Sequence, residues 1–130
     1  MKNYLELTKE IQEHDQPHHN CAQVILCTFS EEMGMDYDQA FAMGTHFGAG
    51  MRCGGTCGAI TGGLMVLGGL DHSSLKAKQL MMNFQENHGC TDCKTLLQKS
   101  REGDGNPKHH CRDLVREMVS NLETMICEEG

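Results

Sequence analysis

Apolar residues recur every three or four positions along most of the chain, which is the spacing of amphipathic helices. No segment alternates as strongly between apolar and polar residues, so strands are not expected. Helices are predicted over residues 2–13, 21–33, 36–43, 58–68, 74–87, 91–100 and from 109 onward. The pattern therefore predicts an all-α fold, an irregular or orthogonal bundle of six to seven helices.

Polar residues that can cap a helix stand at several of the expected starts. Asn20 is followed three residues later by Gln23, which is the spacing of a capping box. Ser73 or Ser74 is expected to cap the fifth helix, and Thr91 the sixth. Such residues satisfy backbone N–H groups that the first turn of a helix leaves without partners.

Glycines crowd the middle of the chain between Gly44 and Gly69. Residues 44–56 are expected to form an irregular, Gly-rich loop before a short central helix. Gly58 and Gly62 lie four positions apart on one face of that helix, so another backbone can approach them closely. Glycine costs a helix about 1 kcal/mol relative to alanine, so close packing must offset its presence there.

Composition and charge narrow the functional classes. The chain has 130 residues and 14.4 kDa, which fits a single helical domain over residues 1–130. A net charge of −7 argues against a nucleic-acid partner, which requires a basic surface. The most apolar stretch, residues 59–70, is too short and too rich in glycine for membrane insertion. The first residues contain no apolar signal region, so a cytoplasmic location is expected.

The eight cysteines are the most informative feature of the composition. Cytoplasmic proteins rarely hold static disulfides, so these cysteines are expected to be metal ligands, redox thiols or small buried hydrophobic residues. Cys27 and Cys127 have apolar neighbours and are expected to serve packing, or to face solvent in the case of Cys127. Cys21 and Cys111 each stand near the first turn of a long helix and are expected to point inward.

Histidines stand beside two of the helix starts. His18 and His19 precede the second helix, and His109 and His110 open the last one. Neutral imidazoles at such positions can bind a transition metal. Exposed polar residues that flank a helix are the simpler interpretation.

Cys57 opens the sequence Cys-Gly-Ala-Ile-Thr-Gly at the start of the central helix. The positive end of the helix dipole and the free N–H groups favour a thiolate there, and such cysteines can titrate well below the free value of about 8.5. Gly58 and Gly62 leave room for a substrate, a partner thiol or a cofactor. The alternative is a tight helix crossing in which Cys57 is only a small residue.

Two pairs of cysteines have spacings that allow both thiols to act at one site. Three residues separate Cys53 from Cys57, and Cys90 and Cys93 form a C-x-x-C motif at a helix start. The C-x-x-C spacing suits chelation of one metal ion and also a dithiol–disulfide couple. Without a preceding strand, the motif does not indicate a thioredoxin-like fold. Two unrelated thiols are the remaining interpretation.

The pattern as a whole resembles the C_GCAxxG_C_C family, which is named for a cysteine, a CGAxxG motif and two further cysteines. The segments that carry the resemblance are residues 20–24, 47–51, 57–62, 64–68, 93–97 and 111–115. The resemblance implies a redox or metal role on four family positions, Cys21, Cys57, Cys93 and Cys111. A related domain lies beside haem in a split-Soret cytochrome, where an iron–sulfur centre has been proposed. This chain has no C-x-x-C-H motif, so covalently bound haem is not expected.

Three functional hypotheses follow from these patterns. The first is an iron–sulfur cluster or other metal site on Cys21, Cys57, Cys93 and Cys111. The second is a thiol–disulfide couple in which Cys57 attacks, and Cys53 or Cys93 resolves the mixed disulfide. The third is a structural zinc-binding or small binding module without turnover, with zinc (Zn) held by Cys53, Cys57, Cys90 and Cys93.

The hypotheses leave the class of protein open between a thiol- or metal-dependent oxidoreductase and an electron-transfer protein. Catalysis is expected at Cys57 and Cys93, with Gly58 and Gly62 beside a bound cofactor. The expected partner is a redox partner protein or a small thiol. The glycine-rich face and a core rich in methionine are compatible with a homodimer.

Overall fold

The computed structural model describes residues 3–13, 18–70, 74–102 and 107–128, which form helices joined by turns and loops. In chain order the elements are α1 (Tyr4–Glu13), α2 (Cys21–Thr28), α3 (Tyr37–Met43), the π-helical turn η1 (Gly50–Gly54), α4 (Gly58–Gly69), α5 (Ser74–His88), α6 (Cys93–Glu102) and α7 (Pro107–Glu128). No strand occurs in these ranges, which contain one isolated bridge between Thr56 and Asp92. The predicted all-α fold is therefore confirmed, with η1 as an addition inside the Gly-rich loop.

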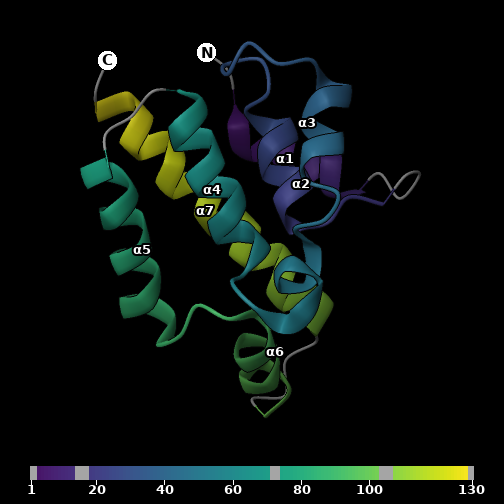
Figure 1. The fold of residues 1–130 in the computed structure, drawn as a ribbon, viewed down its shortest axis with the longest axis vertical. Helices are drawn as coiled ribbons and strands as arrows, with labels where there is room; N and C mark the ends of the chain where they lie inside the picture. Colours follow the sequence, from purple (N-terminus) through teal and green to yellow (C-terminus); the bar gives the residue numbers. More distant parts are fainter. Residues whose placement is uncertain (1–2, 14–17, 71–73, 103–106, 129–130) are drawn as a thin grey trace.

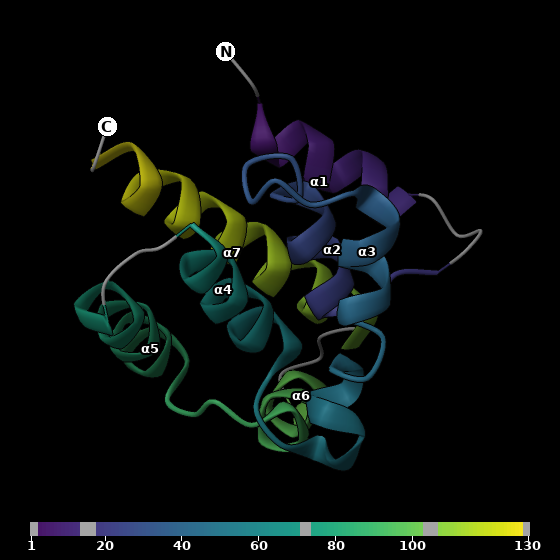
Figure 2. The ribbon, with the colours of Figure 1, turned by 45° about the horizontal axis from the view of Figure 1, so that its top comes forward.

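The helices pack around α2 and α7. Figure 2 shows α7 crossing the molecule diagonally, with α1 along one side and α4 along the other. α2 contacts α1, α3, α4 and α7, and residues 22–28 within it are all buried. α5 packs on α4 at the edge of the bundle, and α6 packs on η1 and α7 (Figure 1). Among the helices of the described ranges, none is long and apolar enough to cross a membrane.

Aliphatic side chains and methionine fill the core. The large, fully buried side chains come mainly from α2, α4, α5 and α7 and include Ile25, Leu26, Ile60, Leu67, Leu80, Met118 and Leu122. Phe29 stacks on Tyr4 with ring centroids 4.8 Å apart, which closes the contact between α1 and the end of α2. The seven cysteines whose side chains are described are free, so burial of apolar surface is the main favourable term for this fold.

α2 and α4 approach each other closely because α4 presents glycines to α2. A Cβ at Gly58 would lie 3.1 Å from the Cβ of Cys21, and a Cβ at Gly62 would lie 3.2 Å from the Cα of Ala22. The close approach that the sequence predicts at these positions is therefore present. Because α2 fills the space beside both glycines, packing explains them, and their role in holding a cofactor stays a prediction.

The end of α2 and the start of α7 differ from those predicted. α2 ends at Thr28 and not at Met33, because residues 29–34 form turns in which the Met33 N–H donates to the Phe29 carbonyl at 3.1 Å. α7 begins at Pro107, before the predicted start at residue 109. Proline suits the first turn of a helix, since its missing N–H would have no intrahelical partner there.

The helix caps are partly as predicted. The capping box of α2 is confirmed, because the Gln23 N–H donates to Asn20 Oδ1 and the Asn20 N–H donates to Gln23 Oε1, both at 2.8 Å. α6 is capped by Asp92 in place of the predicted Thr91, since Asp92 Oδ2 accepts the Thr95 N–H at 2.9 Å. The serine cap that the sequence predicts for α5 lies outside the described side chains.

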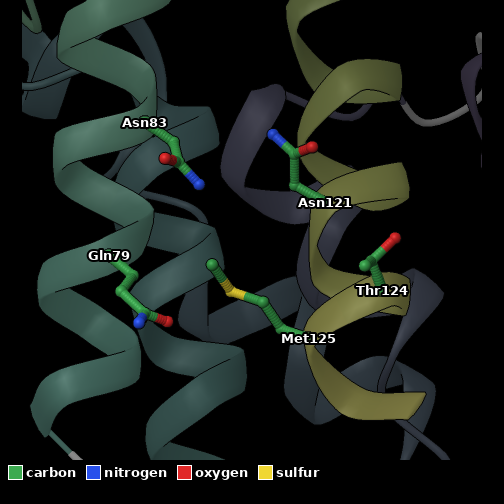
Figure 3. A pocket seen from close by; sticks show the side chains of 5 residues that line it. All are labelled: Gln79, Asn83, Asn121, Thr124 and Met125. Carbon is green, nitrogen blue, oxygen red and sulfur yellow. The ribbon is translucent and has the colours of Figure 1, made fainter. Parts of the chain in front are cut away.

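A polar groove lies between α5 and α7. Its lining consists of Gln79, Asn83, Asn121, Thr124 and Met125. Figure 3 shows Asn83 on α5 and Asn121 on α7 turned toward each other across this groove. None of the described cysteine side chains lines it, so the cysteines that the structure places lie elsewhere.

Candidate functional site

Four cysteines from separate segments meet where α2, α4, α6 and α7 come together. Cys21 opens α2, Cys57 directly precedes α4, Cys93 opens α6 and Cys111 lies near the start of α7. Electrostatic interactions link all six pairs of these thiols. The structure thus brings together the four positions that the sequence resemblance singled out, and they are called the cysteine group below.

A short antiparallel bridge sets Cys57 beside Cys93. Thr56 pairs with Asp92, and the backbone N–H groups of Cys57 and Cys93 each donate to a carbonyl of the opposite segment, at 2.8 and 2.6 Å. Because side chains alternate along extended backbone, Cys57 and Cys93 project from the same face of the bridge. Backbone hydrogen bonds therefore fix the starts of α4 and α6 relative to each other.

Glycine permits the close contacts around this bridge. A Cβ at Gly50 would lie 2.7 Å from the Cβ of Cys93, and the φ of Gly50 is +63°. Both the contact and the left-handed backbone require glycine at this position. On the other side, Gly58 lets the start of α4 approach Cys21. Glycines therefore position two members of the cysteine group, Cys93 against the Gly-rich loop and Cys21 against the start of α4.

Cys21 and Cys111 form the most strongly linked pair of the group. A hydrogen bond between their side chains lowers the pKa of Cys111 to about 7 and raises the pKa of Cys21 well above its ordinary value. Burial and the neighbouring thiols of Cys57 and Cys93 raise the pKa of Cys21 further. Near neutral pH the pair therefore begins to hold one thiolate and one thiol, which share the remaining proton.

Sequence reasoning missed this pair. It treated Cys21 and Cys111 as inward-pointing residues and as candidate metal ligands, with no part in thiol exchange. Their joint place in the family pattern was the only signal that could have found them. Local spacing carries no information here, because the pair depends on how α2 packs against α7.

The prediction of a low pKa at Cys57 is wrong. The side chain is only 5% exposed, and burial raises its pKa to about 11. The N–H groups of Ala59 and Ile60 favour the thiolate, as expected at a helix start, but burial together with the nearby Cys93 outweighs them. The start of α4 was visible in the sequence, whereas the depth at which Cys57 is buried was not.

Cys93 is partly exposed, and its pKa is also raised. Burial is the largest cause, and the charges of Cys111 and Asp92 add to it. Its position at the first residue of α6 therefore does not make it a strongly acidic thiol. An attacking role for Cys57 or Cys93 stays a prediction.

Cys53 and Cys90 engage in local contacts. Cys53 is exposed, and its thiol donates to the Gly50 carbonyl at 3.5 Å. The Cys90 thiol donates to the His88 carbonyl at 3.8 Å. The zinc site that the sequence suggested on these two residues with Cys57 and Cys93 stays a prediction.

Cys27 lies in the hydrophobic core. Its side chain is buried, and its thiol donates to the Tyr37 carbonyl at 3.9 Å. The predicted packing role of Cys27 is therefore confirmed. The side chain of Cys127 lies outside the described part of the structure.

The histidines beside the helix starts have different surroundings. His19 is buried, its Nε2 lies 2.8 Å from the Tyr37 hydroxyl, and its ring meets Phe41 edge to face. His18 is exposed, and the side chain of His109 lies outside the described residues. His19 is therefore held by packing and hydrogen bonding. A metal role for the histidines stays a prediction.

The cysteine group has the donor chemistry of an iron–sulfur centre, because thiolates are the usual ligands of such clusters. Four thiolates so close together repel one another, and a bound cation would relieve that repulsion. Among the described side chains, however, no three or more of His, Cys, Asp and Glu are arranged to hold a single metal ion. The group therefore fits an iron–sulfur centre in donor type and number, and the arrangement around an ion is not preformed.

Comparison with known proteins gives one match. The family model described as "Putative redox-active protein (C_GCAxxG_C_C)" matches residues 19–125, a range that contains the whole cysteine group. No curated protein and no solved structure matches the chain.

Proposed function

The chain belongs to the C_GCAxxG_C_C family, and from this premise we propose that it is a thiol–disulfide redox protein whose exchanging couple is Cys21 and Cys111. The observation that carries the proposal is the hydrogen bond between these two side chains. It pairs a thiolate acceptor with a thiol donor, which are the two forms that exchange requires. A pKa of about 7 at Cys111 is close to the optimum for an attacking thiol at neutral pH.

Exchange with a substrate disulfide proceeds in two steps. The Cys111 thiolate attacks one sulfur of the substrate, so that a mixed disulfide forms and the first substrate thiolate leaves. Cys21 then attacks the sulfur of Cys111, and its proton passes to the second substrate sulfur, which leaves as a thiol. A Cys21–Cys111 disulfide results. The protein loses two electrons, and the substrate disulfide gains them.

The rest of the cysteine group supports this division of roles. Burial raises the pKa values of Cys57 and Cys93, so both thiols stay protonated at the pH at which Cys111 ionises. They therefore do not compete with Cys111 as nucleophiles. The positive end of α2 lies at Cys21 and favours negative charge at the couple.

The proposed couple also leads us to expect a particular cellular compartment and a particular class of partner. A dithiol of this kind must be returned to its reduced form, which suits a reducing cytoplasm. The partner is a thiol or disulfide, carried by a small molecule or by another redox protein. A homodimer is compatible with this chemistry, since one chain contains the whole couple.

The proposal is tested by oxidising the reduced protein with a small disulfide, blocking the free thiols with iodoacetamide and mapping the peptides. A Cys21–Cys111 disulfide is expected in the wild type. Cys21→Ser should stop at the mixed disulfide on Cys111, and Cys111→Ser should form neither product. Cys27→Ala is the matched control and should behave like the wild type. Recovery of Cys21 and Cys111 in alkylated form, with other cysteines oxidised, would contradict the proposal.

An iron–sulfur centre on Cys21, Cys57, Cys93 and Cys111 is the second candidate. The electrostatic linkage of all six thiol pairs favours it. Such a centre would supply one-electron transfer when bound. Purification without oxygen distinguishes the two candidates. Iron with acid-labile sulfide, lost together in Cys57→Ser, supports the centre, whereas iron-free protein with an oxidisable Cys21–Cys111 pair supports thiol exchange.

A further inference from the structure

The Gly-rich loop makes a left-handed turn beside the cysteine group. Ala49, Gly50, Met51 and Arg52 have φ values of 52°, 63°, 59° and 64°. Left-handed backbone is unfavourable for residues with a Cβ, so three of them within four positions persist only where the surrounding structure holds them. The contacts that hold this turn therefore also fix the side chains at its tip.

The turn is anchored to Cys93. The Gly55 N–H donates to the Gly50 carbonyl at 2.8 Å, and the Gly55 carbonyl accepts the Cys93 N–H at 2.6 Å. The Cα of Gly50 lies so close to Cys93 that an added Cβ would clash with it. Residues 51–53, at the tip of the turn, are exposed. The tip is therefore held at a fixed position beside the cysteine group.

The tip and α6, which pack against each other, each present one cation. Arg52 lies on the turn, and the stem of Lys94 lies against the turn, since a Cβ at Gly54 would be 3.1 Å from the Cβ of Lys94. Both side chains are exposed, and neither makes an ion pair with any described residue. The charge of Lys94 lowers the pKa of the nearby Asp92. The Asp92 carboxylate is held at the start of α6, where it accepts the Thr95 N–H.

These cations contrast with the rest of the molecule. The net charge of the chain is −7. Arg112, which follows Cys111 in the chain, is already paired with Asp113 at 3.7 Å. Arg52 and Lys94 therefore form a local positive surface at the edge of the cysteine group, called the basic rim below.

We propose that the basic rim recognises carboxylate groups and that the protein exchanges with low-molecular-weight disulfides that carry them. This inference rests on the proposed thiol–disulfide function. The carboxylates of the substrate lie against the Arg52 guanidinium and the Lys94 ammonium, and the disulfide reaches the cysteine group. A positive rim on an acidic protein attracts anionic substrates to this edge and repels cationic ones.

The test compares three disulfides that differ in charge. Oxidised glutathione is anionic, hydroxyethyl disulfide is neutral and cystamine is cationic. The rate of oxidation of the reduced protein is followed by the loss of alkylatable Cys111. Each rate is divided by the rate of the same disulfide with a small free thiol, which corrects for intrinsic reactivity. The corrected rate is expected to be higher for oxidised glutathione than for hydroxyethyl disulfide, and added salt should reduce this preference.

Removal of the rim charges gives the decisive comparison. The double variant Arg52→Gln/Lys94→Gln should lower the rate with oxidised glutathione by about fivefold to tenfold and change the rate with hydroxyethyl disulfide by less than about twofold. The rate with cystamine should rise. The matched control Lys9→Gln/Lys78→Gln removes the same charge from α1 and α5 and should leave the preference unchanged.

Each other result overturns the inference. If the preference for oxidised glutathione is unchanged in the rim variant, or is reduced equally in the control variant, the basic rim does not recognise the substrate. The proposed thiol exchange is not affected by that result. An equal loss of rate with all three probes assigns the two residues a structural role. No exchange with any probe in the wild type, with Cys21 and Cys111 still alkylated, overturns the proposed function as well.

Discussion

The side chain of Cys21, at the start of α2, is hydrogen-bonded to that of Cys111 on α7. The two helices pack against each other, and α4 approaches the same point because Gly58 leaves room beside Cys21. A shared proton stabilises one thiolate of a pair and disfavours the second ionisation, which explains the opposite pKa shifts. The couple is thus a product of tertiary packing.

Alkylation of Cys111 is expected to depend on Cys21. In the wild type, the rate with iodoacetamide should rise with a midpoint near pH 7, since the pKa of Cys111 is about 7. Cys21→Ala removes the hydrogen bond that favours the thiolate and leaves burial, which raises the pKa of Cys111, so the midpoint should move up to about 8.5 or above. Mass spectrometry of the Cys111 peptide as a function of pH gives both midpoints. Equal midpoints in the two proteins would show that Cys21 does not stabilise the thiolate.

Cys57 is expected to resist alkylation in the folded protein. Its side chain is 5% exposed, and its pKa is raised to about 11, so the reactive thiolate is scarce at pH 8. Exposed Cys53 should react much earlier under the same conditions. Peptide mapping after timed labelling measures both rates, and labelling in denaturant provides the control. Early modification of Cys57 in the native protein would contradict its observed burial.

Asp92 is expected to make the stability of the fold depend on pH. Its pKa is lowered, chiefly by hydrogen bonds with Thr95, so the carboxylate stabilises the folded chain above its unfolded pKa of about 3.9. This contribution is lost as the pH falls through the lower, folded pKa. Asp92→Ala should therefore be less stable than the wild type at pH 7, and the difference should shrink below about pH 4.

Chemical denaturation at a series of pH values measures this contribution. Asp92→Asn is the matched control, because asparagine keeps an oxygen that can cap α6 but does not titrate. The wild type should lose its advantage over Asp92→Asn in acid. If the difference between the wild type and Asp92→Ala stays constant down to pH 3, the carboxylate charge plays no part in the cap.

The fold was predictable where neighbours in sequence decide the outcome. Helical spacing gave α4 to within one residue of its end, and the spacing of Asn20 and Gln23 gave the cap of α2. The end of α2 was not predictable in the same way. Phe29 and Met33 continue its apolar pattern, yet the backbone of residues 29–34 leaves the helix to form turns.

For the site, the sequence predicted which cysteines belong to it but not which thiol ionises first. The resemblance identified the four cysteines, but helix-start arguments made Cys57 the acidic thiol, and burial reverses that assignment. Burial and the Cys21–Cys111 contact depend on how helices pack across the whole chain. The left-handed backbone at Met51 and Arg52 is likewise set by its anchoring to the bridge near Cys93, which no local pattern reveals.

Gly50 is expected to be the most sensitive glycine of the loop, and Gly68 provides the matched control. A Cβ at Gly50 would overlap the Gly55 carbonyl oxygen and lie 2.7 Å from the Cβ of Cys93, on backbone with a φ of +63°. Gly50→Ala should therefore lower the free energy of unfolding by about 2–4 kcal/mol through steric overlap and backbone strain. It should also displace the side chain of Cys93, which lies against Gly50.

Gly68 lies on α4, and an added Cβ would meet no described atom within 4 Å other than those of its chain neighbours and its own helix backbone. Gly68→Ala should raise the free energy of unfolding by about 0.5–1 kcal/mol, because alanine favours the helix and meets no obstacle. Denaturant unfolding of the two variants and the wild type measures both changes. Opposite signs are expected from the same substitution, since the surroundings of each glycine decide its effect. A stability loss of similar size in both variants would mean that general helix or loop propensity, and not the contact with Cys93, determines the role of Gly50.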